Sequence, residues 1–185
     1  MVTDIKITDG TVEIISVVLA KKHLRVEADY IEEDALIEIA IASARTESEN
    51  FVERKLLKGT VEVSMDSFTD FDIALQSLND TVAKVEYYAL GSEERTLLPE
   101  DKYNTSSSYA TLVCKFKQDL PVVADKSDAV IVTISFGYEF VTCPKDIVSA
   151  LLLLVADAFD KRENRGAISH SAARNLLNRP KDKGL

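Results

Sequence analysis

Residues 129–136 read Ala-Val-Ile-Val-Thr-Ile-Ser-Phe, and residues 144–159 read Pro-Lys-Asp-Ile-Val-Ser-Ala-Leu-Leu-Leu-Leu-Val-Ala-Asp-Ala-Phe. The first stretch is rich in β-branched residues, which favour a strand. The second opens on a proline, which suits the first position of a helix, and its centre is apolar nearly all round. We therefore predict a strand followed by a central core helix from Pro144 to about Arg162. Together they indicate a mixed fold.

Upstream of these two elements, the two-residue period of a half-buried strand recurs between residues 60 and 137. It is clearest at Val61–Met65, Val82–Tyr87 and Thr111–Phe116. Short runs of turn-forming residues separate these stretches. The pattern predicts about five to seven short antiparallel strands.

The N-terminal region predicts an extended segment and two helices. Residues 2–15 alternate apolar and polar side chains on both sides of a glycine, which is typical of extended chain. Ser16 suits the N-cap of a short helix, Val17–Leu24. A long helix should follow, from about Tyr30 to Leu56.

This long helix carries two apolar stripes, whereas a surface helix needs only one. Asp29 suits its N-cap, with Glu32 in the capping-box relation. One stripe consists of Leu36, Ile39, Ala40 and Ser43, and the other of Ile37, Ile41, Ala44, Phe51 and Val52. Two stripes indicate packing on two sides, either inside a bundle or between subunits.

The order of these elements predicts an α+β fold: a helical core, made by the long N-terminal helix and the apolar C-terminal helix, with an antiparallel β insertion. We expect a single domain over residues 1–185. Residues 1–58 and 140–185 should be mainly helical, and residues 59–139 should form the insertion.

The composition is that of a globular protein, with 46% hydrophobic and 29% charged residues. The most apolar run, Ala150–Ala156, is much shorter than the roughly 20 residues that a membrane span needs. The N-terminus has no signal-peptide pattern, so we expect a protein made and kept in a cytoplasm, with no membrane partner. Cys114 and Cys143 should therefore be reduced and buried.

The net charge of −9 is unevenly spread. Residues 161–185, which we name the basic tail, contain seven basic and two acidic residues, a net charge of +5. The other residues therefore carry −14 of the total. Such a tail suits an arm that docks on an acidic surface, while an acidic body disfavours strong binding of nucleic acid.

We find no pattern that indicates catalysis, a cofactor or a metal. His23 and His170 have no nucleophile or second ligand at a useful spacing. The acidic run Glu32-Glu33-Asp34 is explained by the positive end of the helix dipole. Gly-rich phosphate loops and nucleophile elbows are missing from the sequence. The chain is therefore expected not to be an enzyme.

Several segments, in order along nearly the whole chain, resemble the head–tail connector (adaptor) proteins of tailed bacteriophages and prophages. The opening motif is Ala20-Lys21-Lys22-His23-Leu24-Arg25-Val26. Val85-Glu86-Tyr87-Tyr88, Phe136-Gly137-Tyr138 and the closing Phe159-Asp160-Lys161-Arg162-Glu163 continue the series.

The resemblance implies a structural virion protein at the head–tail junction, assembled in the host bacterial cytoplasm. Its expected partners are itself in a dodecameric ring, the portal protein, and a stopper or tail-completion protein. The ring would dock under the portal after DNA packaging, extend the channel and provide an attachment platform. DNA would pass through it without sequence-specific binding.

The candidate assembly-interface residues come from the long helix and from the basic tail. They are Arg45, Phe51, Arg162, Arg165, Arg174, Leu176, Leu177 and Arg179. Two alternatives to the connector remain open at this point. One is another head or tail completion protein, and the other is a small α+β enzyme or ligand-binding module.

Overall fold

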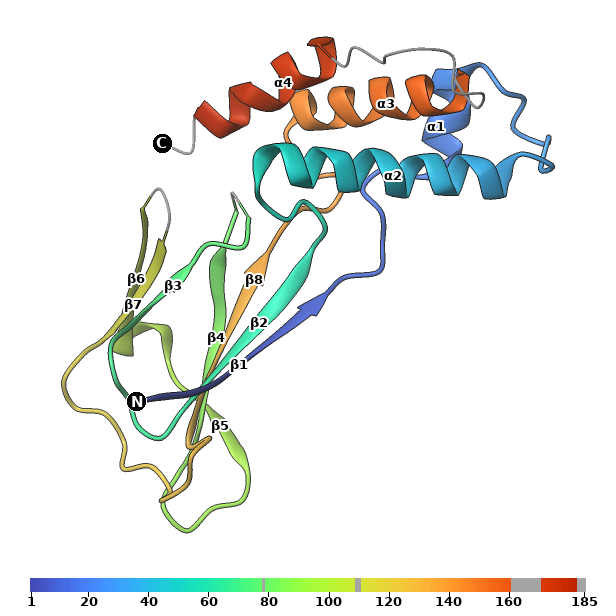
Figure 1. The fold of residues 1–185 in the computed structure, drawn as a ribbon. Coiled ribbons are helices and arrows are strands. Elements are labelled where there is room, and N and C mark those ends of the chain that lie inside the picture. Colours follow the sequence, from blue (N-terminus) through green and yellow to red (C-terminus); the bar gives the residue numbers. More distant parts are fainter. Residues whose placement is uncertain (78, 109–110, 161–170, 183–185) are drawn as a thin grey trace. The chain divides into compact units, whose positions relative to one another are not determined.

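Strands and helices separate into two units in the computed structural model, which describes all residues except 78, 109–110, 161–170 and 183–185. The β unit comprises Met1–Gly10 and Lys58–Gly137, and the helical unit comprises Thr11–Leu57 and Tyr138–Leu185. Figure 1 labels the elements of both. The α+β class predicted from the sequence is confirmed.

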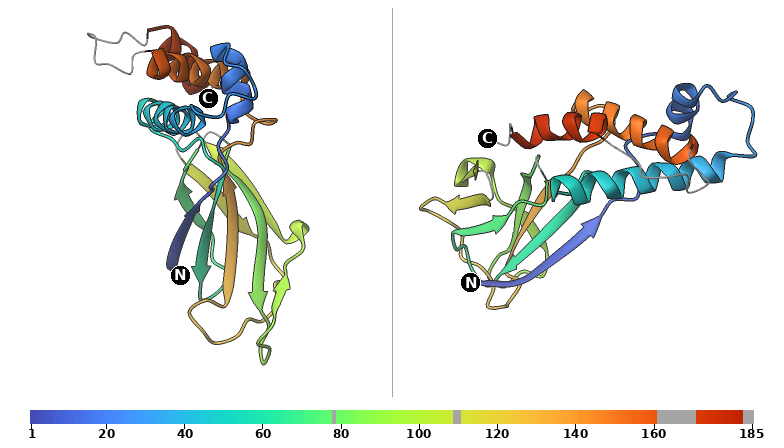
Figure 2. Two further views of the ribbon diagram at one scale, coloured as in Figure 1. Left: turned by 90° about the vertical axis from the view of Figure 1, so that its right-hand side faces the viewer. Right: turned by 45° about the horizontal axis from the view of Figure 1, so that its top comes forward.

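The β unit is built from strands that form two antiparallel sheets (Figures 1 and 2). The larger sheet has the order β1-β2-β8-β4-β5, and the smaller has the order β3-β7-β6. The strands are β1 (Val2–Asp9), β2 (Gly59–Met65), β3 (Phe71–Ala74), β4 (Thr81–Tyr88), β5 (Arg95–Leu97), β6 (Tyr103–Ser108), β7 (Thr111–Phe116) and β8 (Val130–Phe136). A short 3-10 turn, η1 (Glu100–Lys102), precedes β6.

The two sheets share one hydrophobic core. Strand β2 alternates buried and half-buried side chains along its whole length, as its sequence predicts. Strand β8 is buried on both faces except at one residue, because it lies between β2 and β4 in the middle of the larger sheet. The core residues, from both sheets and from Leu98 just after β5, are Val61, Val63, Met65, Phe71, Val85, Leu98, Tyr103, Leu112, Cys114, Val130, Val132, Ile134 and Phe136.

The N-terminal strand β1 extends this sheet, so the β unit takes in more of the chain than the expected insertion. Residues 11–15 do not continue the strand, although their alternation predicts extended chain. Instead, Ile14 and Ile15 are buried in the core of the helical unit. Two adjacent apolar side chains bury together there, which the pattern of a half-exposed strand does not anticipate.

The helical unit contains α1 (Val17–Leu24), α2 (Asp34–Val52), α3 (Lys145–Asp160) and α4 (Ser171–Asp182). Ser16 caps α1 as predicted, because its hydroxyl accepts a hydrogen bond from the Leu19 N–H at 3.2 Å. Helix α3 contacts the other three helices, which explains why its sequence is so apolar. It is the central helix of this unit, as predicted.

Helix α2 is shorter than predicted at both ends. It begins at Asp34, and the Asp29–Glu32 capping box does not form. The reason is Lys21 on α1, whose ammonium group donates to the carbonyls of Ala28 and Tyr30 and thereby holds this segment as a loop.

The C-terminal end of α2 is set by a left-handed residue, Glu53 (φ 56°). The helix therefore stops at Val52, and Leu56 lies beyond it. The carboxylate of Glu49 accepts hydrogen bonds from the N–H groups of Leu56 and Leu57 at 2.8 and 3.2 Å. The Glu49 side chain thus accepts hydrogen bonds from backbone N–H groups just beyond the end of the helix.

Candidate assembly interface

Arg45 lies in an ion-pair network inside the helical unit. Its Nε donates to both carboxylate oxygens of Glu13 at 3.1 Å, and its Nη1 donates to Glu49 at 2.9 Å. Burial works to lower the pKa of this guanidinium, but the hydrogen bonds and charges of Glu13 and Glu49 together raise it. Arg45 therefore ties the segment before α1 to α2. Its proposed role in assembly stays a prediction.

Phe51 and Arg174 meet where α2 and α4 pack together. The guanidinium carbon of Arg174 lies 5.6 Å from the centroid of the Phe51 ring, within the range of a cation–π contact. Phe51 is half-buried and Arg174 is exposed. This pair brings together two of the predicted interface residues and leaves the arginine accessible.

Helix α4 belongs to the core of the helical unit. Ala173 and Leu177 on α4 are buried, and Leu177 is only 1% exposed, whereas Leu176 is half-buried. One face of this part of the basic tail therefore packs within the chain, and its docking on an acidic surface stays a prediction. Arg162 and Arg165 lie outside the described residues, and the side chain of Arg179 is likewise not described.

The two stripes of α2 have different surroundings. The second stripe is buried at Ile37, Ile41, Ala44 and Val52. The first stripe is exposed at Leu36 (47%) and Ile39 (66%), although Ala40 is buried. The wide apolar surface of this helix is thus only partly covered within the chain, as packing between subunits would require.

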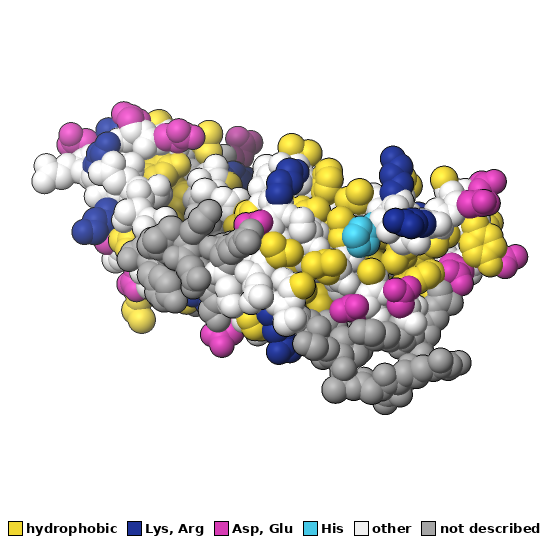
Figure 3. All heavy atoms as spheres, turned by 90° about the horizontal axis from the view of Figure 1, so that it is seen from above, with side chains coloured by type: hydrophobic (Ala, Val, Ile, Leu, Met, Phe, Trp, Pro, Cys, Tyr) yellow, Lys and Arg dark blue, Asp and Glu magenta, His cyan; other side chains and the backbone are white. Residues whose placement is uncertain are grey.

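The loop before α2 adds to this uncovered surface, and sequence reasoning missed it by placing these residues in a helix. Tyr30 and Ile31 are 44% and 72% exposed, beside the acidic residues Glu27, Asp29 and Glu32. Figure 3 shows acidic side chains around hydrophobic ones at its right-hand end, where residues 26–33 lie in Figure 1. The alternation of acidic and apolar residues from Glu27 to Glu33 was the available signal.

The histidine and the two cysteines that the structure describes have ordinary structural surroundings. His23 is exposed on the surface of α1. Burial raises the pKa of Cys114 to about 11 and that of Cys143 to about 12, so neither is a ready nucleophile. Within the described residues, no three His, Cys, Asp or Glu side chains group closely enough to hold a metal ion. Nor is any described helix both long and apolar enough to cross a membrane.

Residues 15–101 match the sequence family described as Phage gp6-like head-tail connector protein. The matched region covers α1, α2 and the strands from β2 to β5, including the Ala20–Val26 motif. The match confirms the family resemblance that the motifs predict. None of the curated proteins compared matches the sequence.

Solved structures of gene transfer agent (GTA) particles contain chains with the same fold. One is titled "Neck of empty GTA particle computed with C6 symmetry", with a TM-score of 0.64, 16% identity, and coverage of 95% of this chain and 94% of that chain. For "Virion of native gene transfer agent (GTA) particle", the TM-score is 0.60 and the identity is 19%, with coverage of 94% of this chain and 93% of that chain. For "Neck of native GTA particle computed with C12 symmetry", the TM-score is 0.59 and the identity is 15%, with coverage of 95% of this chain and 94% of that chain. The likeness shows that the fold is shared along nearly the whole chain.

Proposed function

We propose that the chain is a structural virion protein, a subunit of the head–tail connector (adaptor) ring of a tailed phage or a related particle. The observation that carries this proposal is the connector-family match over residues 15–101. The fold likeness to chains of GTA necks and virions supports it, because it extends over both the helical and the β unit. The two units would then act together as one connector domain.

In this role the ring docks under the portal after DNA packaging, at the head–tail junction. It extends the DNA channel and offers an attachment platform to a stopper or tail-completion protein. A ring of twelve copies is compatible with both neck titles, because twelvefold symmetry contains sixfold symmetry. The chain assembles in the cytoplasm of the host bacterium.

The charge of the chain suits a DNA channel. Apart from the basic tail, the chain carries a net charge of −14. A surface of this sign repels phosphates, so DNA can pass without being gripped. The role needs no catalytic step.

The test is assembly of the purified full-length chain, measured by size-exclusion chromatography with light scattering and by negative-stain imaging. We expect ring-shaped oligomers as concentration rises, and binding of these rings to the portal protein of the same particle. The proposal would be overturned if the chain is a monomer at every concentration and does not bind the portal protein. An isolated monomer that forms a ring only on the portal would support it.

A further inference from the structure

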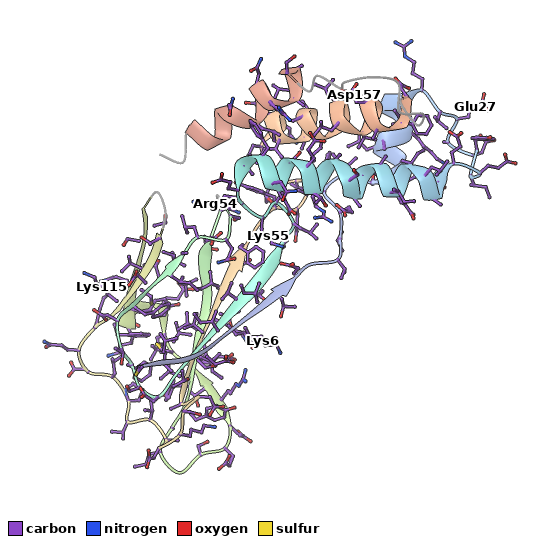
Figure 4. All side chains as sticks on the ribbon, viewed as in Figure 1. Lys6, Glu27, Arg54, Lys55, Lys115 and Asp157 are labelled. Atoms are coloured by element: carbon purple, nitrogen blue, oxygen red, sulfur yellow. The ribbon has the colours of Figure 1, made fainter. Side chains whose placement is uncertain are left out.

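The helical unit is charged differently at its two ends. Residues 26–33 contain four acidic residues and no basic one. At the opposite end of α2, Arg54 follows the exposed Glu53, and Arg174 of α4 lies over the Phe51 ring. Figure 4 labels Glu27 beyond one end of α2 and Arg54 beyond the other. Because α2 has 19 residues, these ends lie about 28 Å apart.

At the acidic end, a patch of uncovered apolar side chains lies beside the carboxylates. Leu36 and Ile39 are three positions apart and therefore share one face of α2. We name this the acidic end surface; it consists of Glu27, Asp29, Tyr30, Ile31, Glu32, Leu36 and Ile39. Exposed apolar patches rimmed by charges mark interaction sites.

At the other end, an aromatic ring lies under a cation. Arg174 sits over Phe51, and half-buried Arg54 follows on the same end of α2. We name Phe51, Arg54 and Arg174 the basic end surface. Its apolar centre can pack against the exposed apolar side chains of the acidic end surface, and its positive charge is opposite to that of the carboxylates there.

We propose that the acidic end surface of one copy docks on the basic end surface of the next copy. This inference rests on the proposed ring function and names the contact that builds the ring. A contact between two unlike surfaces of the same chain is head-to-tail, and such contacts form a ring when the rotation from one copy to the next closes. Pairing of the first stripe of α2 with a neighbour also accounts for its exposure in the single chain.

Charge reversal at each end tests the contact. One variant carries Glu27→Lys and Asp29→Lys, and the other carries Arg54→Glu and Arg174→Glu. Each variant alone would meet a like charge in its neighbour, so the concentration for half-assembly should rise at least about tenfold. The matched control is Glu93→Lys with Asp101→Lys, two exposed residues of the β unit, which should assemble as the unchanged chain does.

Mixing the two reversed variants gives the sharper readout. In an alternating ring every contact again joins opposite charges, so the equimolar mixture should assemble at close to the original concentration. Far-ultraviolet circular dichroism of each variant checks that the helices remain folded. Recovery in the mixture also shows that both variants are folded, since a misfolded partner cannot restore assembly.

The outcomes separate this inference from the proposed function. If the unchanged chain assembles and the reversed variants assemble equally well, the contact is wrong and the ring function stands. The contact is also wrong if each variant fails alone and the mixture does not recover although both are folded. If the unchanged chain neither assembles nor binds the portal, the proposed function fails and this inference fails with it.

Discussion

Replacing Lys21 by Met should destabilise the helical unit and release the loop before α2. The Lys21 side chain is only 5% exposed, and its ammonium group pairs with the Asp34 carboxylate and donates to the carbonyls of Ala28 and Tyr30 at 3.3 and 2.9 Å. Methionine has a similar length and fills the same space, but it cannot donate. The change therefore isolates the polar contacts from the packing.

The magnitude follows from the three contacts. A hydrogen bond to a charged group contributes about 1.5–3 kcal/mol. Burying the ammonium group costs several kcal/mol, which the methionine variant recovers. Because Asp34 is partly solvated (35% exposed), we place the net loss at about 2–4 kcal/mol in the free energy of unfolding. For a chain of this length the melting temperature should fall by roughly 5–12 °C.

The measurement is urea unfolding followed by far-ultraviolet circular dichroism, with hydrogen exchange of residues 26–33 as a local readout. Lys22→Met is the matched control, because Lys22 is the exposed neighbour on the same helix and its loss should change stability by no more than about 0.5 kcal/mol. If both variants unfold at the same urea concentration, or if the loop exchanges no faster in Lys21→Met, the reasoning is refuted.

Three further changes probe the rest of the chain. Arg45→Gln should lower the free energy of unfolding by about 2–3 kcal/mol in urea titrations, because two partly buried carboxylates lose their cation. Leu177→Ala should lower it by about 2–5 kcal/mol and Leu176→Ala by clearly less, because only Leu177 is fully buried. Cys114 and Cys143 should resist a thiol reagent at pH 8 until the chain unfolds. Since burial raises both pKa values, to about 11 and 12, their contribution to stability is fully present below the pKa of an unfolded thiol, near 9, and is lost as the pH rises toward those values.

The strands and the helices α1 and α3 could be predicted because local sequence decides them. Strand β2 alternates in sequence as it alternates in burial, and Ser16 fixes the start of α1. The start of α2 could not be predicted in this way, because the side chain of Lys21, seven and nine residues before Ala28 and Tyr30, holds the loop through their carbonyls. A side-chain contact from the preceding helix there overrides a favourable capping pattern.

The candidate interface, too, could be predicted only where local sequence decides it. Composition reveals the charge of the basic tail, but it does not tell which of its residues are buried. Helix α4 has the sequence of an amphipathic arm, yet Leu177 is used in the core of the helical unit. The exposed stripe of α2 was predicted as apolar, and only the packing shows that Leu36 and Ile39 remain uncovered.

The motif that carries the family resemblance is used mainly to build structure. Ala20 and Lys21 are buried, and Arg25 adopts a left-handed conformation (φ 60°) while the next N–H bonds to the Lys21 carbonyl at 3.0 Å. These contacts end α1 and direct the chain into the loop at residues 26–33. The motif thus sets the start of the loop whose acidic residues belong to the proposed contact between copies.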